Sequence, residues 1–100
     1  MNMQQIMQQA QRMQAKLRKA QAALEQEEFS ITKGGAVTVK MLGSKRITAI
    51  EIDDDAFDVE NKEMVVAMIT LAVNELIEQI QAKSDKIQEE ITGQAGGLGF

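Results

Sequence analysis

The sequence contains no cysteine and no histidine. Without cysteine the chain can form neither a disulfide nor a thiolate site, which fits a reducing compartment. Catalysis would have to use carboxylates, lysines or hydroxyl groups, and no serine lies in a motif that supplies it with a base. The sequence therefore predicts a protein that is not an enzyme, with no catalytic residue, no cofactor and no small-molecule substrate.

Aromatic residues and long hydrophobic runs are also scarce. Phenylalanine occurs three times and methionine seven times, so the core must be aliphatic and filled by methionine. The longest apolar run, from Met64 to Val73 with Thr70 inside it, is too short to cross a bilayer. The N-terminus lacks the apolar segment of a secretory signal. We expect a cytoplasmic protein without a membrane partner.

The net charge of −4 conceals an asymmetry along the chain. Residues 1–46 hold eight cations and three acids, a net charge of +5. Residues 47–100 hold three lysines and twelve acids, a net charge of −9. The overall acidity argues against a nucleic-acid partner, but it hides a basic N-terminal half.

Residues 2–28 contain neither proline nor glycine and consist mainly of good helix formers, which predicts a long first helix. Apolar residues recur there at alternating spacings of three and four, the heptad seam of a helix pair. At ~1.5 Å per residue this helix is roughly 40 Å long, so part of it must project or pack on another chain. The seam residues are Met3, Ile6, Ala10, Met13, Leu17, Ala20 and Leu24.

Basic residues flank this seam. Arg12, Lys16 and Lys19 follow one another at helical spacing on one flank. Arg18 lies on the other flank, and no acid precedes Glu25. Such charges can form a solvated helix surface. Arginine, lysine and the neighbouring glutamines also contact phosphates and base edges, so an anionic partner is the second interpretation, which the missing acids favour.

Three short runs with alternating apolar and polar residues follow, at 29–32, 36–42 and 46–52. Glycine occurs in both turns between them, at Gly34-Gly35 and Gly43-Ser44. In the third run Ile50 and Ile52 share one face and Ile47 falls on the other, which a bulge near Ile47 or a doubly covered strand would explain. The sequence predicts an α+β fold in which a helix covers a three-stranded antiparallel sheet.

A second helix is predicted over residues 62–91. Its first half is apolar nearly all the way round, so more than its own sheet must bury it, which indicates a homodimer. Its second half keeps an apolar seam through Leu76, Ile80, Ile87 and Ile91, with Lys83 where the spacing requires an apolar residue. This interruption indicates that the core ends near Ile80 and that the rest of the helix extends outward beside the first helix.

An acidic connector, residues 53–60, precedes this helix. It lacks the glycine that a calcium loop needs at its sharp turn, so no metal site is predicted. Asp58 or Asn61 is expected to cap the second helix. We place a single domain at residues 1–92 and expect residues 93–100, which are rich in glycine, to form a flexible tail.

Several short motifs follow one another along the whole chain. They are Gln9-Ala10-Gln11-Arg12-Met13-Gln14-Ala15-Lys16, a Gly-Gly hairpin into Val37-Thr38-Val39, Ile50-Glu51-Ile52-Asp53, Asn61-Lys62-Glu63-Met64, Ala72-Val73-Asn74-Glu75 and a closing Gly-Gly-Leu-Gly. In this order and spacing, the chain resembles the YbaB/EbfC family of small nucleoid-associated proteins. One departure is the second turn, where Leu42-Gly43-Ser44-Lys45 stands in place of the family's Gly-rich turn.

The resemblance implies an α-β-β-β-α domain that forms a tight homodimer, with long helices projecting like the arms of a tweezer. It also implies binding to double-stranded DNA in the nucleoid, with an influence on nucleoid organisation and gene expression, and no enzymatic activity. The basic and glutamine positions of the family's first helix correspond here to Gln11, Arg12, Lys16 and Lys19. The charge pattern adds Arg18 to these candidate DNA-binding residues.

The sequence is compatible with two functions. In the first, a dimer presents the cations of the first helix to duplex DNA. In the second, the chain is a helical protein–protein interaction module or adaptor without direct DNA binding, and the seam from Met3 to Leu24 recruits a helix of another protein. The seam discriminates between them, because no groove remains for a partner helix if Met13 and Leu17 are already buried.

Overall fold

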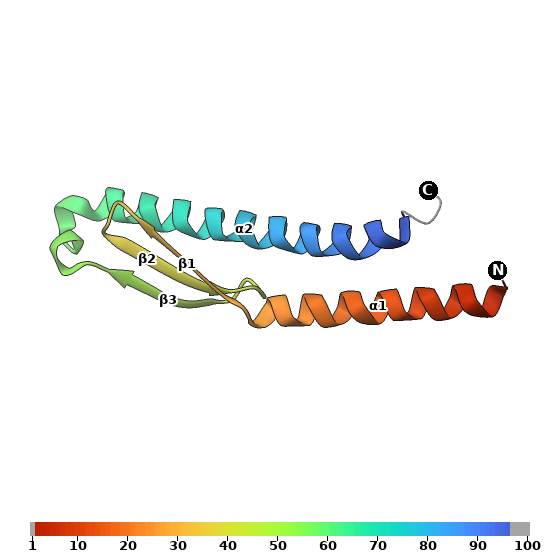
Figure 1. The fold of residues 1–100 in the computed structure, drawn as a ribbon. Helices are drawn as coiled ribbons and strands as arrows, with labels where there is room; N and C mark the ends of the chain where they lie inside the picture. Colours follow the sequence, from red (N-terminus) through yellow and green to blue (C-terminus); the bar gives the residue numbers. More distant parts are fainter. Residues whose placement is uncertain (1, 97–100) are drawn as a thin grey trace.

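The computed structural model describes residues 2–96, and its elements follow the order α-β-β-β-α (Figure 1). The predicted α+β fold, with a three-stranded antiparallel sheet between two long helices, is confirmed. The elements are α1 (Met3–Gln26), β1 (Glu28–Lys33), β2 (Val37–Leu42), β3 (Ile47–Ile52), the 3-10 turns η1 (Asp54–Ala56) and η2 (Val59–Asn61), and α2 (Lys62–Gly96).

α1 begins where the sequence supplies a cap. Asn2 has extended backbone, and its Oδ1 accepts a hydrogen bond from the backbone N–H of Gln5 at 2.8 Å. This bond satisfies one of the N–H groups that the first turn of a helix leaves without a partner. The helix ends at Gln26 because Glu27 returns to extended backbone and leads directly into β1.

β2 is the central strand of the sheet, and β1 and β3 pair with it antiparallel on either side. Val37, Val39 and Met41 are buried on one face of β2, and the residues between them point to the other face. Both glycines of the first turn, Gly34 and Gly35, have positive φ (58° and 65°), which glycine adopts without strain.

β3 contains the irregularity that its sequence indicated. Successive residues of β2 pair with Ala49 and Ile47, so Thr48 is an extra residue opposite β2. The predicted bulge near Ile47 is therefore confirmed. It brings Ile47 onto the face that carries Ile50 and Ile52, which gives β3 a single apolar face.

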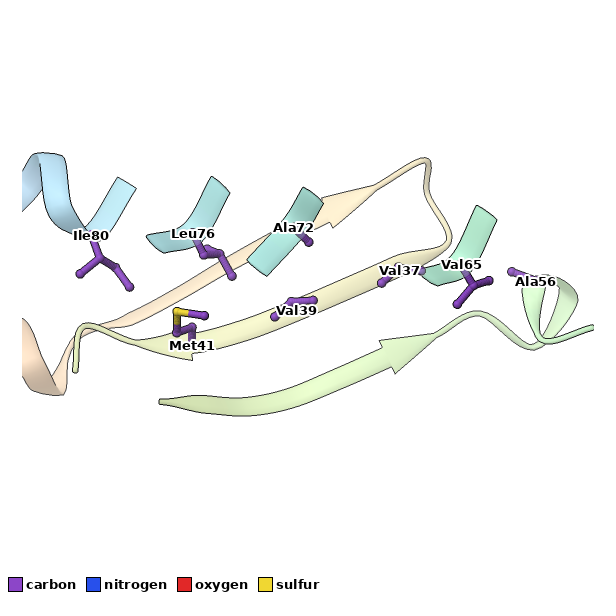
Figure 2. Packing of buried hydrophobic residues seen from close by; sticks show 8 residues of the cluster. All are labelled: Val37, Val39, Met41, Ala56, Val65, Ala72, Leu76 and Ile80. Atoms are coloured by element: carbon purple, nitrogen blue, oxygen red, sulfur yellow. The ribbon is translucent and has the colours of Figure 1, made fainter. Parts of the chain in front are cut away.

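α2 covers the apolar face of β1 and β2 and forms the core with them. Figure 2 shows Ala72, Leu76 and Ile80 of α2 above β2, with Val65 near Ala56. The buried cluster consists of Val37, Val39, Met41, Ala56, Val65, Ala72, Leu76 and Ile80. α2 leaves β3 partly uncovered. Ile47 and Ile50, which lie on the same face of the sheet as the core, are therefore 43% and 45% exposed.

The acidic connector forms two short 3-10 turns, η1 and η2. The Asp58 side chain accepts a hydrogen bond from the N–H of Glu60 at 3.1 Å and so caps η2, which runs directly into α2. The expected cap at Asp58 thus acts on the turn that opens α2. Within residues 2–96, no three acidic side chains are grouped as metal ligands.

The outer half of α2, residues 81–96, lies beside α1, and the two helices run antiparallel beyond the sheet (Figure 1). We call this helix pair the arm, and it confirms the expectation that α2 extends outward beside the first helix. The molecule measures 69 × 22 × 15 Å. Its radius of gyration, 19.8 Å, far exceeds the about 13 Å of a compact domain of about 100 residues.

The predicted tail falls partly inside α2. The helix continues to Gly96, past the expected start of the tail at Gly93. The remaining tail residues, 97–100, lie outside the part of the chain that the structure describes. Over the described residues, neither helix combines the length and the apolar character needed to cross a membrane.

Candidate nucleic-acid interface

All five candidate DNA-binding residues lie on α1 and are exposed, as the helical periodicity requires. α1 holds four cations and one acid, Glu25, which lies at its sheet end. The ion pairs within residues 2–96 are formed by other lysines, so these four cations are open to an anionic partner. The five residues are Gln11, Arg12, Lys16, Arg18 and Lys19.

Helical spacing divides these residues into two sets, because each residue turns the helix by about 100°. Arg12, Lys16 and Lys19 share one side of α1, which we call the cationic flank. Gln11 and Arg18, seven residues apart, lie on the opposite side, which we call the glutamine flank because Gln14 and Gln21 also belong to it. The structure therefore brings together three of the five residues on one surface and the other two on another.

The seam between the flanks packs on α2. Met13, Leu17 and Ala20 are half-buried and Leu24 is buried, and the facing half-buried residues of α2 include Ile87 and Ile91. The groove that a partner helix would need between Met13 and Leu24 is therefore already occupied by α2 of the same chain. The outer end of the seam, at Met3, Ile6 and Ala10, is exposed.

Ser84 occupies the seam position of α2 for which sequence spacing had indicated Lys83. Its Oγ donates a hydrogen bond to Oε1 of Gln21 at 3.1 Å, and Nε2 of Gln21 donates to the Ser84 carbonyl oxygen at 3.2 Å. Ile80, Ser84, Ile87 and Ile91 form a regular spacing of four, three and four. The spacing of apolar residues alone does not indicate Ser84, because this seam position holds a polar residue that bonds to Gln21 across the seam.

Lys83 lies beside the seam and not in it. Its Nζ pairs with the Glu27 carboxylate and lies 5.6 Å from the centroid of the Phe29 ring. Because these side chains are about half exposed, the ion pair contributes at most about 1 kcal/mol, and its main effect is to place Lys83 on the side of the arm where β1 begins.

The turn between β2 and β3 holds the sheet end of α1. The N–H of Gly43 donates to the Glu27 carbonyl at 2.9 Å, and the N–H of Ser44 donates to the Glu25 carbonyl at 3.2 Å. A Cβ at Gly43 would lie 1.8 Å from the carbonyl oxygen of Leu24, so only glycine permits this approach. These contacts satisfy carbonyls at the end of α1 and fix the direction in which the helix leaves the sheet.

Lys45, in the turn between β2 and β3, links this anchor to α2. Its φ is 71°, and its Nζ donates a hydrogen bond to Oε1 of Gln81 at 3.0 Å. The turn therefore contacts both helices of the arm at their base.

The chain thus combines an extended arm, exposed cations at helical spacing on α1 and an attachment of α1 to the sheet through the turn between β2 and β3. Residues 1–95 match the model of the YbaB/EbfC DNA-binding family. The chain belongs to this family. The match includes all of α1 and α2 up to residue 95, so the YbaB/EbfC assignment does not depend on the sheet alone.

Relatives named nucleoid-associated protein support the YbaB/EbfC assignment. One from Alkaliphilus metalliredigens is 40% identical over 93 residues, covering 92% of this chain and 82% of the relative. One from Clostridium novyi is 37% identical over 94 residues, covering 93% and 82%. One from Chloroflexus aurantiacus is 33% identical over 99 residues, covering 98% and 99%. The YbaB/EbfC family is described by DNA binding and not by a reaction.

Proposed function

We propose that this YbaB/EbfC chain binds duplex DNA as a homodimer, without enzymatic activity, and acts as a nucleoid-associated protein in the cytoplasm. The observation that carries the proposal is the surface of α1, where four exposed cations on a projecting arm precede the first acid. The names of the curated relatives support the association with the nucleoid.

The cations act on the DNA backbone by releasing condensed counterions. Two copies of four cations neutralise up to about eight phosphates, and each contact adds about −0.9 to the slope of log K against log salt. Arginine and lysine also form charge-assisted hydrogen bonds with phosphate oxygens. Gln11 shares the glutamine flank with Arg18, and its amide group can contact base edges there.

The apolar surface between β3 and α2 supports the homodimer. Ile47 and Ile50 are about half exposed on the helix-facing side of β3, where α2 does not reach. Val73 and Ile77 of α2 are only half-buried. Val66 is 54% exposed, and beside it an apolar depression continues to Phe57 and Val59. Such a surface favours burial against another chain, and a second copy supplies the same apolar residues.

The test of DNA binding is fluorescence anisotropy with a random-sequence duplex, across about 50 to 200 mM salt. We expect the wild-type affinity to fall steeply with salt. The variant Arg12→Ala/Lys16→Ala/Lys19→Ala removes the cationic flank and loses up to six of the dimer's phosphate contacts, so its affinity at low salt falls by at least about 100-fold.

The matched control is Lys40→Ala/Arg46→Ala/Lys62→Ala, which removes the same charge from the sheet and the start of α2. It should bind more tightly than the flank variant at every salt concentration. Equal losses in the two variants would mean that net charge and not the arm decides binding. Absence of wild-type binding at the lowest salt concentration would overturn the proposed function itself.

A further inference from the structure

The outer half of α2 carries charges of both signs beside α1. We infer that α2 supplies Lys86 to the cationic flank as a further phosphate contact, and that it places Glu90 on the same side as a counter-charge that lowers the affinity for DNA. This inference rests on the proposed DNA binding by α1.

The hydrogen bonds between Gln21 and Ser84 place these two residues opposite each other across the arm. They therefore fix the position of Lys86 along the arm relative to the residues of α1. Because α1 and α2 are antiparallel, each step outward on one helix is matched by a step outward on the other (Figure 1). Lys19 is two residues outward from Gln21, and Lys86 is two residues outward from Ser84. The two lysines therefore lie level across the arm.

The next level outward combines opposite charges. Lys16 is five residues outward from Gln21, and Glu90 is six residues outward from Ser84. Their positions along the arm differ by about one residue, or about 1.5 Å. Glu90 therefore lies level with the middle of the cationic flank.

Contacts at the base of the arm identify its two sides. On one side, which we call the hairpin side, Lys45 bonds to Gln81, and a depression there is also lined by Gln21. On the other side, which we call the β1 side, Lys83 pairs with Glu27 immediately before β1.

The periodicity of α2 places Lys86 and Glu90 on the β1 side. They follow Lys83 by three and seven residues, which is the spacing of residues on one helix face. Glu89 is turned away from the seam with α1, because it lies about half a turn from both Ile87 and Ile91. Glu89 and Glu90 are neighbours in sequence, but they therefore face different surfaces of the arm.

The periodicity of α1 places the cationic flank on the same β1 side. Gln21 lines the hairpin side, and Arg18 and Gln14 continue this glutamine flank at spacings of three and four. The cationic flank lies across the helix from them and therefore shares the β1 side with Lys86 and Glu90. All of these charged side chains are exposed.

A phosphate bound by the cationic flank is consequently attracted by Lys86 and repelled by Glu90. A unit charge about 6 Å from a phosphate in water changes the affinity by about threefold. Glu90 can also attract Lys16 when no DNA is bound, and this attraction opposes binding further. Glu90 therefore limits the affinity of the arm for DNA.

The experiment measures the affinity of the full-length protein for a random-sequence duplex across the same salt series. Glu90→Gln should bind about threefold more tightly than wild type at low salt, whereas Glu89→Gln should differ much less, because its charge is directed away from the flank. Lys86→Gln should bind about threefold more weakly and reduce the salt slope by about 0.9 for each lost contact. Lys62→Gln, at the sheet end of α2, is its matched control.

The outcomes separate this inference from the proposed function. Equal affinities of the Glu90→Gln and Glu89→Gln variants, in a protein whose wild type binds with a steep salt slope, overturn the inference and leave DNA binding by α1 intact. Absence of binding by the wild type overturns both. Thermal unfolding of each variant shows whether the exposed substitutions leave the fold unchanged, and only variants that unfold at the wild-type temperature enter the comparison.

Discussion

Gly43 shows how one residue can determine the direction of a helix. Its backbone lies against the last turn of α1, where it donates a hydrogen bond to Glu27 and leaves no room for a side chain next to Leu24. The sequence indicated Gly43 only as part of a turn. The close approach could not be predicted from local pattern, because it depends on where the end of α1 meets a hairpin that follows β2.

Replacing Gly43 with alanine should therefore destabilise the protein far more than a change in a surface turn. We expect a loss of at least about 3 kcal/mol, because overpacking costs about 1–3 kcal/mol and each lost hydrogen bond adds about 1 kcal/mol. Urea unfolding followed by circular dichroism measures this change.

Gly93→Ala is the control for Gly43→Ala. A Cβ at Gly93 meets no atom within 4 Å, and the residue lies within α2. Alanine should therefore stabilise the protein by about 0.5–1 kcal/mol relative to glycine in a helix. Similar effects of the two substitutions would contradict the packing that we assign to the hairpin.

At the scale of elements, both helices and all three strands could be predicted, because their patterns differ in period. Apolar residues of α1 recur at three and four, and those of β2 at two, so the helix and the strand are distinguished by sequence alone. The bulge in β3 could also be predicted, because Ile47 disagrees in phase with Ile50. The outer half of α2 was expected beside α1, but the residues that meet across the seam could not be identified, because a heptad pattern shows that a helix is covered and not which residues cover it.

The sequence was sufficient to identify α1 as the helix that carries the candidate site. It was not sufficient to identify which surface of the arm these residues form. The cations of α1 were evident from composition and spacing. Their division between two flanks becomes meaningful only when the position of α2 is known, since α2 separates the side of Arg12 from that of Arg18. Ser84 was missed because a polar residue in a seam is visible only together with its partner, Gln21.

α2 itself offers a comparison between two leucines that face different surroundings. Leu76 is fully buried against the sheet, whereas Leu71 is 60% exposed. Leu76→Ala should cost about 2–5 kcal/mol, because it removes buried methyl groups and leaves a cavity. Leu71→Ala should cost less than about 1 kcal/mol. Thermal and urea unfolding of the two variants compare them directly, and equal losses would contradict the orientation of α2 on the sheet.

At the scale of the whole molecule, the cations of α1 and the apolar surface between β3 and α2 lie in different parts of the fold. The arm carries the cations of α1, and the opposite end carries the acidic connector together with the exposed Phe57 and Val59 (Figure 1). A homodimer formed through the surface between β3 and α2 would leave both arms free. The proposed dimer and the proposed DNA contacts therefore do not compete for the same residues.

The variant Ile50→Asp/Val73→Asp tests this separation. It puts charges into the apolar surface, so we expect a monomer where the wild type has twice the chain mass of 11.0 kDa. The monomer should keep its secondary structure but lose about half of the salt slope of DNA binding, because it presents half as many cations. Light scattering after gel filtration and the anisotropy assay measure the two effects.

Ala67→Asp is the matched control for the dimer variant, since Ala67 is exposed and lies on the side of α2 that faces away from the sheet. It should remain dimeric. A wild-type protein that is monomeric at all concentrations would contradict the proposed dimer, and a monomeric variant with the full salt slope would show that one arm is sufficient for binding.

In the arm, the first helix of the chain packs against the last one. Gln21 and Ser84, which bond across the arm, are 63 residues apart in sequence. A ribosome releases α1 first, and the seam of α1 has no partner until the outer half of α2 has been synthesised. For most of the time of translation, Met13 and Leu17 are therefore exposed to water and to other chains, and the surface proposed to bind DNA is the last part of the molecule to be completed.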